Sequence, residues 1–415
     1  MNVIETIARQ ARAAGRLVAK AGPVRRSAAL TAIADAVEAR RAEVLAANAE
    51  DLALAEKNGM SRPMLDRLRL DDKRLTAVAN AVREIAAAPD PVGETVKEWT
   101  RPNGLKVGRR RIPLGVIAMI YESRPNVTTD AAALCLRAGN AVILRGGSEA
   151  FRSNQALARC ISDGLAKSGL PQEAVQLIPT TDREAMTELL QRDEEIDLVI
   201  PRGGEALIRF VAERSRIPVI KHYRGNCHIF IEKTADTGLG LEICYNAKVP
   251  RPGVCNAVET ILVDDAIAQA FLPQLAARLQ PAGVELRGDE RARAIVPSMT
   301  PATLEDFDTE FVDLICAVGV VDGVDGAIRH IERHTSSHTE AIITRDPALA
   351  KRFVDEIDSS TVIVNASTRF ADGGELGLGA EIGISTTRLH AYGPMGAEEL
   401  TTTKFVVFGE GQVRT

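Results

Sequence analysis

Residues 115–169, GVIAMIYESRPNVTTDAAALCLRAGNAVILRGGSEAFRSNQALARCISDGLAKSG, alternate short apolar runs with longer amphipathic ones. The runs at 115–120 and 140–147 are too short for core helices, and each leads into residues whose apolar side chains recur at helical spacing. A strand that is apolar on both faces and is followed by a helix is typical of a parallel sheet covered by helices. This stretch therefore predicts a doubly wound α/β domain.

The rest of the chain extends this pattern on both sides. The strand and helix alternation continues through residues 174–214 and restarts near Ile217 as a second α/β unit that runs to Asn365. On the N-terminal side, residues 1–88 carry apolar side chains at helical spacing and predict a helical entry region.

Two further segments predict a small antiparallel element. Residues 95–115, TVKEWTRPNGLKVGRRRIPLG, alternate polar and apolar side chains around Asn103-Gly104, which favours a β-hairpin. Residues 402–413, TTKFVVFGEGQV, predict one more strand near the C-terminus. A polar hairpin without a core of its own is marginal in isolation, so we expect it to lie against something else, such as a second subunit.

Composition excludes several classes of protein. The chain has 415 residues, of which 45% are hydrophobic and 26% charged, so it is long enough for two or three cores. Its net charge of -5, with Lys and Arg spread along the chain, argues against nucleic acid as a partner. No apolar run approaches the ~20 residues that cross a bilayer, which argues against a membrane protein. The Arg-rich N-terminus continues into helical pattern and predicts a structural helix rather than a transit peptide.

Cysteine usage points to a reducing compartment. The six cysteines form no CxxC pair and no His/Cys cluster, so we expect neither a disulfide framework nor a metal site. A cytoplasmic location fits this pattern best.

Two Arg-Gly-Gly motifs each follow a predicted strand and open a predicted helix. They are Arg145-Gly146-Gly147, which Ser148 follows, and Arg202-Gly203-Gly204. Glycine lets the backbone approach a ligand, a helix start presents free N–H groups, and arginine adds an anion donor, so both are candidate phosphate cradles. The alternative is a tight strand-to-helix turn with a solvated arginine. Neither motif matches GxGxxG or GxxxxGK[ST], so a standard dinucleotide fingerprint and a P-loop kinase are both unsupported.

Cys255 differs from the other five cysteines. Those five fall within helical or strand patterns and are most simply small core residues, namely Cys135, Cys160, Cys227, Cys244 and Cys316. Cys255 lies in VPRPGVCNAVET, where Pro250, Pro252 and Gly253 impose a turn before a strand and Arg251 places a cation close by. A neighbouring cation can lower the pKa of a thiol from ~8.5 and produce a nucleophilic thiolate. The sequence therefore predicts Cys255 as a catalytic nucleophile.

Several motifs together resemble the aldehyde dehydrogenase superfamily, and within it the reductases that act on acyl phosphates. They are the Cys255 loop, Asn126 in YESRPNVT, the segment HTSSHTEAIITRD at 334–346 and the strand TVIVNAS at 361–367. The similarity extends essentially from end to end, and the run VDGAIRHIERHTSSHTEAI is highly specific for one enzyme of that branch.

The resemblance implies an aldehyde-dehydrogenase-like α/β fold with two doubly wound parallel-sheet domains and a small β oligomerisation flap. The cofactor-binding domain is expected at 1–95 and 114–232, and the catalytic domain at 233–366. The hairpin and C-terminal strand, 96–113 and 367–415, are expected to form the flap. A homo-oligomer, either a dimer or a tetramer, follows from that expectation.

The resemblance also assigns roles near the nucleophile. Asn126 occupies the position that, with the N–H of the cysteine, holds the oxyanion of the tetrahedral intermediate. Oxidising members carry a water-activating Glu in a Glu-Leu-Gly-Gly motif, which His222-Tyr223-Arg224-Gly225 replaces here. Transfer to phosphate needs no activated water, so this departure favours phosphate-linked reduction. The candidate substrate-binding residues are Arg124, His222, Arg224 and Arg251.

For the cofactor, the resemblance indicates NADPH. Arg145 replaces the strand-end residue that often accepts ribose hydroxyls, and it could pair with a 2′-phosphate. Glu149 would oppose that phosphate if it pointed inward. Glu310, in DTEFVDL, resembles the residue that holds the nicotinamide ribose, although it could equally be an exposed carboxylate beside Asp308.

The implied reaction is NADPH-dependent reduction of L-glutamate 5-phosphate to L-glutamate 5-semialdehyde and phosphate through a cysteine thioester, a step of proline biosynthesis. A transient contact with glutamate 5-kinase, which makes this unstable substrate, would be a further expectation. Two alternatives stay open. An oxidative aldehyde dehydrogenase would share the fold, and a non-catalytic phosphometabolite-binding regulator would need the Arg-Gly-Gly motifs but no thiol.

Overall fold

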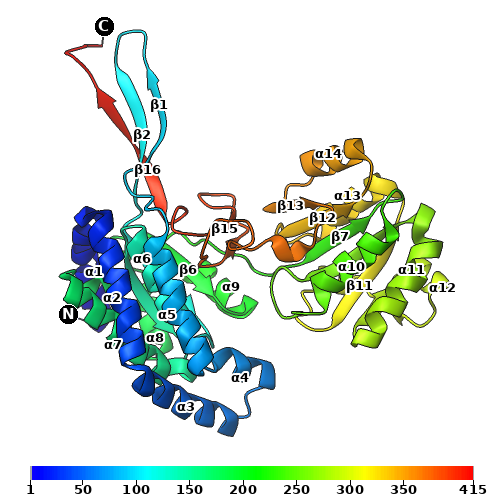
Figure 1. The fold of residues 1–415 in the computed structure, drawn as a ribbon, viewed down its shortest axis with the longest axis horizontal. Helices are drawn as coiled ribbons and strands as arrows, with labels where there is room; N and C mark the ends of the chain where they lie inside the picture. Colours follow the sequence, from blue (N-terminus) through cyan, green and yellow to red (C-terminus); the bar gives the residue numbers. More distant parts are fainter. Residues whose placement is uncertain (1, 415) are drawn as a thin grey trace. The chain divides into compact units, whose positions relative to one another are not determined.

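The computed structural model describes residues 2–414, apart from the side chain of Pro63 (Figure 1). The chain forms two compact units. Unit 1 comprises Met1–Lys221, Leu378–Gly383 and Met395–Thr415, and unit 2 comprises His222–Gly377 and Ile384–Pro394. Among the described residues, no helix is long and apolar enough to cross a membrane.

Unit 1 begins with the predicted helical region. Its helices are α1 (Val3–Lys20), α2 (Gly22–Ala39), α3 (Arg41–Lys57), α4 (Arg62–Leu68) and α5 (Asp72–Ala87). Side-chain caps start two of them, because Asn2 accepts a hydrogen bond from the N–H of Ile4 and Asp71 accepts one from that of Arg74. The expectation of a helical entry region over residues 1–88 is confirmed.

A four-stranded parallel sheet forms the centre of unit 1, in the order β5-β4-β3-β6. Its strands are β3 (Val116–Tyr121), β4 (Ala141–Gly146), β5 (Val175–Leu177) and β6 (Leu198–Arg202). The connecting and flanking helices are α6 (Asn126–Arg137), α7 (Phe151–Ser168), α8 (Arg183–Leu189) and α9 (Glu205–Arg214). Every residue of β3 is buried, as its uninterrupted apolar sequence predicts for a central strand.

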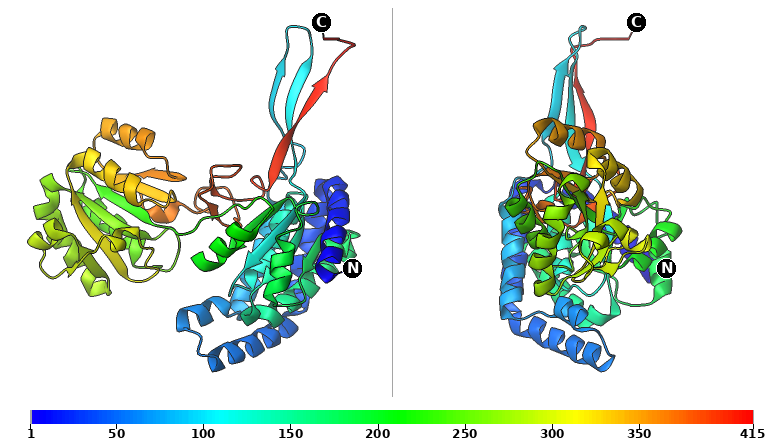
Figure 2. Two further views of the ribbon diagram at one scale, coloured as in Figure 1. Left: turned by 180° about the vertical axis from the view of Figure 1, so that it is seen from behind. Right: turned by 90° about the vertical axis from the view of Figure 1, so that its right-hand side faces the viewer.

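A separate three-stranded antiparallel sheet also belongs to unit 1. It consists of β1 (Thr95–Thr100), β2 (Lys106–Pro113) and β16 (Thr401–Phe408), with β2 in the middle. The views of Figure 2 show the three strands side by side, extending away from the helices of the unit. The hairpin turn closes with Arg101 N–H donating to the carbonyl of Leu105, and Gly104 takes a φ of 86° in the left-handed region. The predicted hairpin and C-terminal strand thus pair with each other.

Unit 2 is built on a seven-stranded, wholly parallel sheet in the order β10-β9-β11-β8-β7-β12-β13. The strands are β7 (Cys227–Ile231), β8 (Val258–Asp264), β9 (Glu285–Gly288), β10 (Thr300–Pro301), β11 (Ile315–Val321), β12 (Thr339–Ile343) and β13 (Thr361–Val364). The helices are α10 (Thr237–Lys248), α11 (Asp265–Leu279), α12 (Glu290–Ile295), α13 (Gly323–His334) and α14 (Pro347–Glu356). A two-stranded ribbon joins β14 (Ile384–Ser385) to β15 (Gly393–Pro394).

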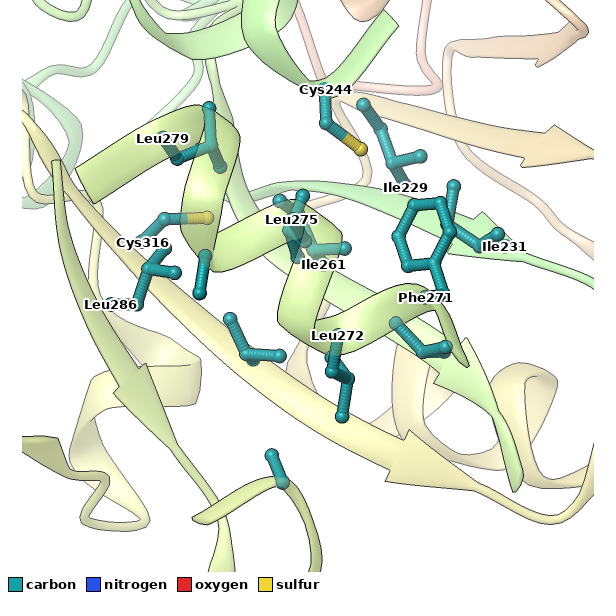
Figure 3. Close-up of a cluster of buried hydrophobic side chains, with 14 of the residues drawn as sticks. Ile229, Ile231, Cys244, Ile261, Phe271, Leu272, Leu275, Leu279, Leu286 and Cys316 are labelled. Atoms are coloured by element: carbon teal, nitrogen blue, oxygen red, sulfur yellow. The ribbon is translucent and has the colours of Figure 1, made fainter. Parts of the chain in front are cut away.

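The sheet of unit 2 is held in place by a buried core. Figure 3 shows Phe271, Leu272 and Leu275 of α11 packed against Ile229 of β7 and Ile261 of β8. Each of these side chains is at most 1% exposed. Full burial of such a side chain contributes roughly 1.5–3 kcal/mol, so this core fixes β7 and β8, and four of the candidate site residues lie just before these two strands, namely His222, Arg224, Arg251 and Cys255.

The boundary between the two α/β parts differs from the one expected at residue 232. Strand β7 pairs with β8 and β12, so it belongs to the sheet of unit 2, which begins at His222. The sequence pattern could not show this, because a lone apolar strand does not reveal which sheet it joins. Residues 367–377 and 384–394, expected in the flap, likewise belong to unit 2.

Candidate active site

The predicted site residues fall into two groups, one in each unit. In unit 1 they follow the carboxyl ends of the parallel strands, and they are Arg124, Asn126, Arg145, Gly146, Gly147, Ser148, Arg202, Gly203 and Gly204. In unit 2 they precede the amino ends of the strands, and they are His222, Arg224, Arg251, Cys255 and Glu310. The two sheets therefore present candidate functional groups at opposite strand ends.

Cys255 lies in the turn between α10 and β8, as the Pro-Gly pattern predicts. The turn closes with Ala257 N–H donating to the carbonyl of Val254 over 3.0 Å. Cys255 is partly exposed, whereas the other five cysteines are buried. Burial raises the pKa of those five thiols, in the case of Cys160 to about 11. Among the residues that the structure describes, Cys255 is therefore the one cysteine that is not buried, and it is the natural candidate for a nucleophile.

The backbone around Cys255 is held on several sides. The thiol of Cys227 donates to the carbonyl of Cys255 over 3.2 Å. The Asn256 amide donates to the carbonyl of Ala371 over 3.0 Å. Gly225 packs so closely that a Cβ there would lie 2.1 Å from the carbonyl oxygen of Cys255. Sequence reasoning did not single out Cys227 or Asn256 for this role, because nothing in the local pattern shows which distant segment a strand end contacts.

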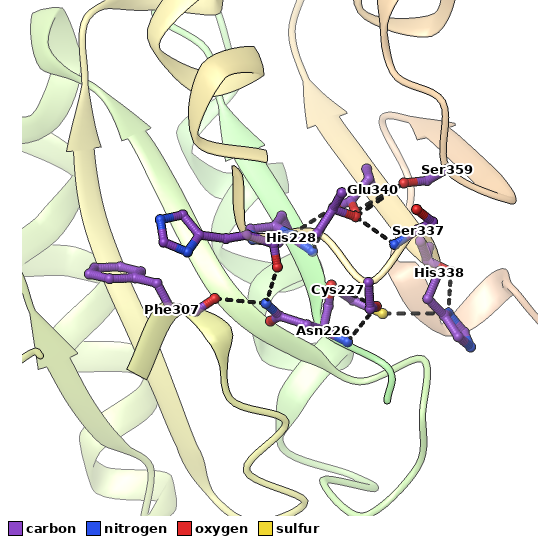
Figure 4. A network of polar contacts seen from close by, with 12 residues as sticks. Asn226, Cys227, His228, Phe307, Ser337, His338, Glu340 and Ser359 are labelled. Carbon is purple, nitrogen blue, oxygen red and sulfur yellow. Dashed lines mark hydrogen bonds and ion pairs between the residues drawn. The ribbon is translucent and has the colours of Figure 1, made fainter. Parts of the chain in front are cut away.

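The residues just before β7 are joined to neighbouring segments by polar contacts, and Figure 4 shows those of Asn226. The Asn226 amide donates to the carbonyls of Phe307 and His334, both over 2.7 Å. The Arg224 guanidinium donates to the carbonyl of Asp308. One N–H group of the Arg224 guanidinium is therefore used in a contact within unit 2. Residues 222–225 contain no carboxylate.

Two further histidines of unit 2 lie near the start of β7: His338 beside His222, and His330 beside His228. Nδ1 of His338 lies 3.6 Å from the sulfur of Cys227. The centroid of the His338 ring is 6.1 Å from the centroid of the His222 ring. Burial lowers the pKa of His338 to about 3. His330 packs against Phe307, and burial also lowers its pKa to about 3. Both histidines are therefore neutral at physiological pH, and neither serves as a cation for the substrate.

These neutral histidines predict acid sensitivity. A histidine in the unfolded chain has a pKa near 6.5. Below that pH the unfolded state binds more protons than the folded state, in which both histidines have pKa values of about 3. The free energy of unfolding therefore decreases as pH falls from about 6.5 towards 3. At about pH 5.5, each such histidine lowers the free energy of unfolding by roughly 1.4 kcal/mol relative to neutral pH. We therefore expect the free energy of unfolding from urea titrations to fall between about pH 7.5 and 5.5, and to fall by ~1 kcal/mol less in His330→Phe. An equal decrease in the variant and the parent chain would contradict this assignment.

Glu310 is half-buried in unit 2 rather than an exposed carboxylate. A buried ion pair lies nearby, in which the Lys248 ammonium donates to Glu259 over 2.5 Å. Burial raises the pKa of Glu259 to about 8, the Lys248 charge opposes that rise, and the negative charge of Glu310 adds to it. Glu310 thus lies close enough to the start of β8 for its charge to act on the residues that follow the Cys255 turn.

In unit 1, the first Arg-Gly-Gly motif is followed two residues later by Glu149, the carboxylate that would oppose a 2′-phosphate if it pointed inward. Glu149 points inward, and it accepts hydrogen bonds from the N–H and, over 2.9 Å, the hydroxyl of Ser123 at the end of β3. Arg145 donates from Nη2 to the carbonyl of Thr181 over 2.8 Å. Burial lowers the pKa of Arg145, while the charges of Glu149 and Glu122 raise it.

At each of the two helix starts, a protein carboxylate already accepts a hydrogen bond from a backbone N–H group. At the start of α7, the Asp51 carboxylate accepts from the N–H of Ser153 over 2.8 Å. Before α9, the Glu122 carboxylate accepts from the N–H of Gly204 over 3.0 Å. Protein carboxylates bind at both helix starts because they satisfy backbone donors that are otherwise orphaned. A phosphate at either position would have to displace or avoid a negative charge.

Asn126 is the first residue of α6, directly after the loop that follows β3. Its amide donates to the Asp130 carboxylate over 2.8 Å. Burial raises the pKa of Asp130 to about 6. An amide nitrogen carries two N–H groups, so this contact orients the side chain and leaves the second N–H for another acceptor.

Comparisons with known proteins agree with this arrangement. The aldehyde dehydrogenase family model matches residues 2–310. The chain is 56% identical over 411 residues to the gamma-glutamyl phosphate reductase of Geobacter metallireducens, an alignment that covers 99% of this chain and 98% of that protein.

Solved structures give the same result. The crystal structure of gamma-glutamyl phosphate reductase from Thermotoga maritima superposes with a TM-score of 0.98 at 45% identity, covering 100% of both chains. An engineered glycolyl-CoA reductase with bound NADP+ shares the fold at 16% identity, with a TM-score of 0.71 over 98% of this chain and 97% of that one. The predicted aldehyde-dehydrogenase-like fold is confirmed, and the chain belongs to the gamma-glutamyl phosphate reductase family of the aldehyde dehydrogenases.

Proposed function

We propose that this chain catalyses the NADPH-dependent reduction of L-glutamate 5-phosphate to L-glutamate 5-semialdehyde and phosphate, the second step of proline biosynthesis from glutamate. The observation that carries the proposal is Cys255, the accessible thiol of a chain that is 56% identical to a gamma-glutamyl phosphate reductase. Its turn is rigidly held, as a nucleophile that must meet one carbonyl carbon requires.

Cys255 would act as the nucleophile in the first half of the reaction. Its thiolate forms a bond to C5 of the substrate, the bond from C5 to the phosphate oxygen breaks, and phosphate leaves with that electron pair. A thioester remains on Cys255. Cationic side chains favour departure of the phosphate, and the sequence-based candidates for that role or for the α-carboxylate remain Arg124, Arg224 and Arg251.

The segment before β7 supports reduction over hydrolysis. Residues 222–225 contain no carboxylate to activate water, and His222 lies beside the neutral, buried His338. Without an activated water the thioester persists long enough to be reduced. This feature argues against the oxidative alternative, in which a base must hydrolyse the same intermediate.

The strand ends of unit 1 fit a nicotinamide dinucleotide, the cofactor class of the aldehyde dehydrogenases. The Glu149 carboxylate can accept ribose hydroxyl groups, and Nε of Arg145 is a buried donor without a hydrogen-bond partner. We infer that the Arg145 guanidinium pairs with a 2′-phosphate and so favours NADPH over NADH, although the Glu149 charge reduces that preference. The glycines of both Arg-Gly-Gly motifs, with Ser148, would line the same site, and Glu310 would hold the nicotinamide ribose. When bound, the cofactor supplies the hydride that converts the thioester to the aldehyde.

Asn126 is proposed as the donor to the oxyanion that forms when the thiolate adds to the carbonyl. Its contact with Asp130 supports this role, because a donor that is already oriented stabilises developing charge without reorganisation. Removing one such donor typically costs ~10²- to 10³-fold in rate.

The three-stranded sheet is proposed as an oligomer contact. Its strand β16 lies at an edge, and two of its aromatic side chains, Phe405 and Phe408, are 67% and 69% exposed. A sheet whose side chains are largely exposed or half-buried and whose edge strand is unpaired on one side favours association with a second copy. A cytoplasmic location and a transient contact with glutamate 5-kinase complete the proposal.

The reverse reaction tests the proposal. Purified protein given L-glutamate 5-semialdehyde, inorganic phosphate and NADP+ is expected to produce NADPH, followed by its absorbance, at a rate that saturates with phosphate. We expect NAD+ in place of NADP+ to require a higher concentration for half-maximal rate. Turnover that does not depend on phosphate would instead support the oxidative dehydrogenase, and absence of turnover would favour the regulator.

A further inference from the structure

Arg369 is joined to the residue that follows the nucleophile. It lies in the short turn Thr368–Phe370 after β13, and its Nη1 donates to Oδ1 of Asn256. The Asn256 amide donates back to the carbonyls of Arg369, over 3.3 Å, and Ala371, over 3.0 Å. This reciprocal contact fixes the guanidinium beside the Cys255 turn and engages only one of its five N–H donors in a side-chain contact.

The charge of Arg369 is poorly compensated within unit 2. The side chain is half-buried, and burial, followed by the nearby positive charge of Arg251, lowers its pKa. Asp372, Cys255 and Glu375 oppose that shift, but no carboxylate of the described residues lies within ion-pair distance of the guanidinium. A partly desolvated arginine without an ion pair is unfavourable in isolation and is typical of a site that receives an anion.

We propose that Arg369, together with Arg251, binds the phosphate group of the acyl phosphate while Cys255 attacks. This proposal rests on the proposed function. The phosphate is attached to the carbon that Cys255 attacks, whereas the α-carboxylate is separated from it by three carbon atoms, so a cation fixed at the nucleophile meets the phosphate. As the sulfur–carbon bond forms and the carbon–oxygen bond breaks, the arginines receive the departing phosphate. In the reverse direction they hold inorganic phosphate for attack on the thioester.

Protection of Cys255 from alkylation tests phosphate binding without catalysis. Because the other five cysteines are buried, iodoacetamide should label Cys255 selectively in the native protein. Inorganic phosphate is expected to slow this labelling, and in Arg369→Met the phosphate concentration for half protection should rise about 10- to 100-fold. Arg369→Lys, which keeps the charge but loses the planar fork, should lie between the two.

A matched control is Arg345→Met. Arg345 is an exposed arginine of the same unit that pairs with Asp236 beyond the carboxyl end of β12, at the opposite edge of the sheet. Its removal should leave both labelling and phosphate protection unchanged. Loss of protection in both variants would indicate a general electrostatic effect and overturn the proposal.

Kinetics of the reverse reaction separate this proposal from the proposed function. In Arg369→Met the KM for phosphate should rise at least about tenfold while the KM for the semialdehyde changes little. A rise confined to the semialdehyde KM would assign Arg369 to the α-carboxylate, and unchanged constants with unchanged protection would exclude anion binding. Either of these results would overturn the role of Arg369 in phosphate binding. Turnover by the wild type would still support the proposed function. If the wild type does not turn over, the proposed function fails, and phosphate protection still decides whether Arg369 binds the anion.

Discussion

Replacing Cys255 by alanine is expected to lower phosphate-dependent formation of NADPH from L-glutamate 5-semialdehyde by at least ~10⁴-fold. The reason is that the other five thiols are buried and burial raises the pKa of each, so none can take over as the nucleophile. The measurement is the initial rate with saturating phosphate, for the variant and the parent chain at equal concentration of folded protein.

Cys160→Ala provides the matched control. Cys160 is buried in α7 of unit 1, where its thiol donates to the carbonyl of Ala156 over 3.3 Å. This variant should retain the parent rate, and it should still incorporate iodoacetamide at Cys255. Cys255→Ala should incorporate almost none under native conditions. Substantial turnover by Cys255→Ala would exclude a covalent mechanism through this residue.

The elements of the fold could be predicted largely from local pattern. The apolar run at 116–121 became the fully buried strand β3, and the helical spacing before residue 88 became five helices. These predictions succeed because burial on both faces and burial on one face leave different periodicities in a sequence. The assignment of β7 to a sheet depends on long-range pairing with β12, and the local pattern carries no trace of it.

The candidate site was predictable only where the chemistry is local. The turn residues around Cys255 are adjacent in sequence, so their effect on that side chain could be anticipated. Gly225 and Asn256 precede the amino ends of β7 and β8, whereas Arg369 follows β13 and contacts Asn256, so these contacts join segments that are far apart in the sequence. Their contacts arise from the order of the strands in the sheet, and one sequence alone does not determine that order.

The carboxylates of unit 1 illustrate the same limit. A glycine-containing turn before a helix predicts free N–H groups, which would suit a phosphate. In the fold, Asp51 from α3 and Glu122 from the end of β3 accept hydrogen bonds from those groups. The local motif is correct about the backbone geometry, but a distant side chain decides which acceptor the backbone meets.

Gly225→Ala is the second change from which we expect a large effect. A methyl group at this position would lie 2.1 Å from the carbonyl oxygen and 2.8 Å from the carbonyl carbon of Cys255, and backbone atoms cannot move aside as a side-chain end can. Either β7 or the Cys255 turn must shift. A displacement of ~1 Å at a reacting atom can lower the rate by ~10²-fold, and the overpacking costs about 1–3 kcal/mol of stability.

The measurements are the reverse rate, the iodoacetamide labelling rate of Cys255, and the free energy of unfolding from urea titrations. Gly238→Ala is the control, because a Cβ there would meet only the Asp236 carboxylate, at 3.4 Å, in ordinary contact. Parent-like turnover by Gly225→Ala would contradict the close contact. A lower reverse rate with an unchanged labelling rate and an unchanged free energy of unfolding would mean that the substitution affects a later step than exposure of the Cys255 thiol. We expect the turn itself to move, so rate and labelling should change together, because the carbonyl that the methyl displaces belongs to the nucleophile.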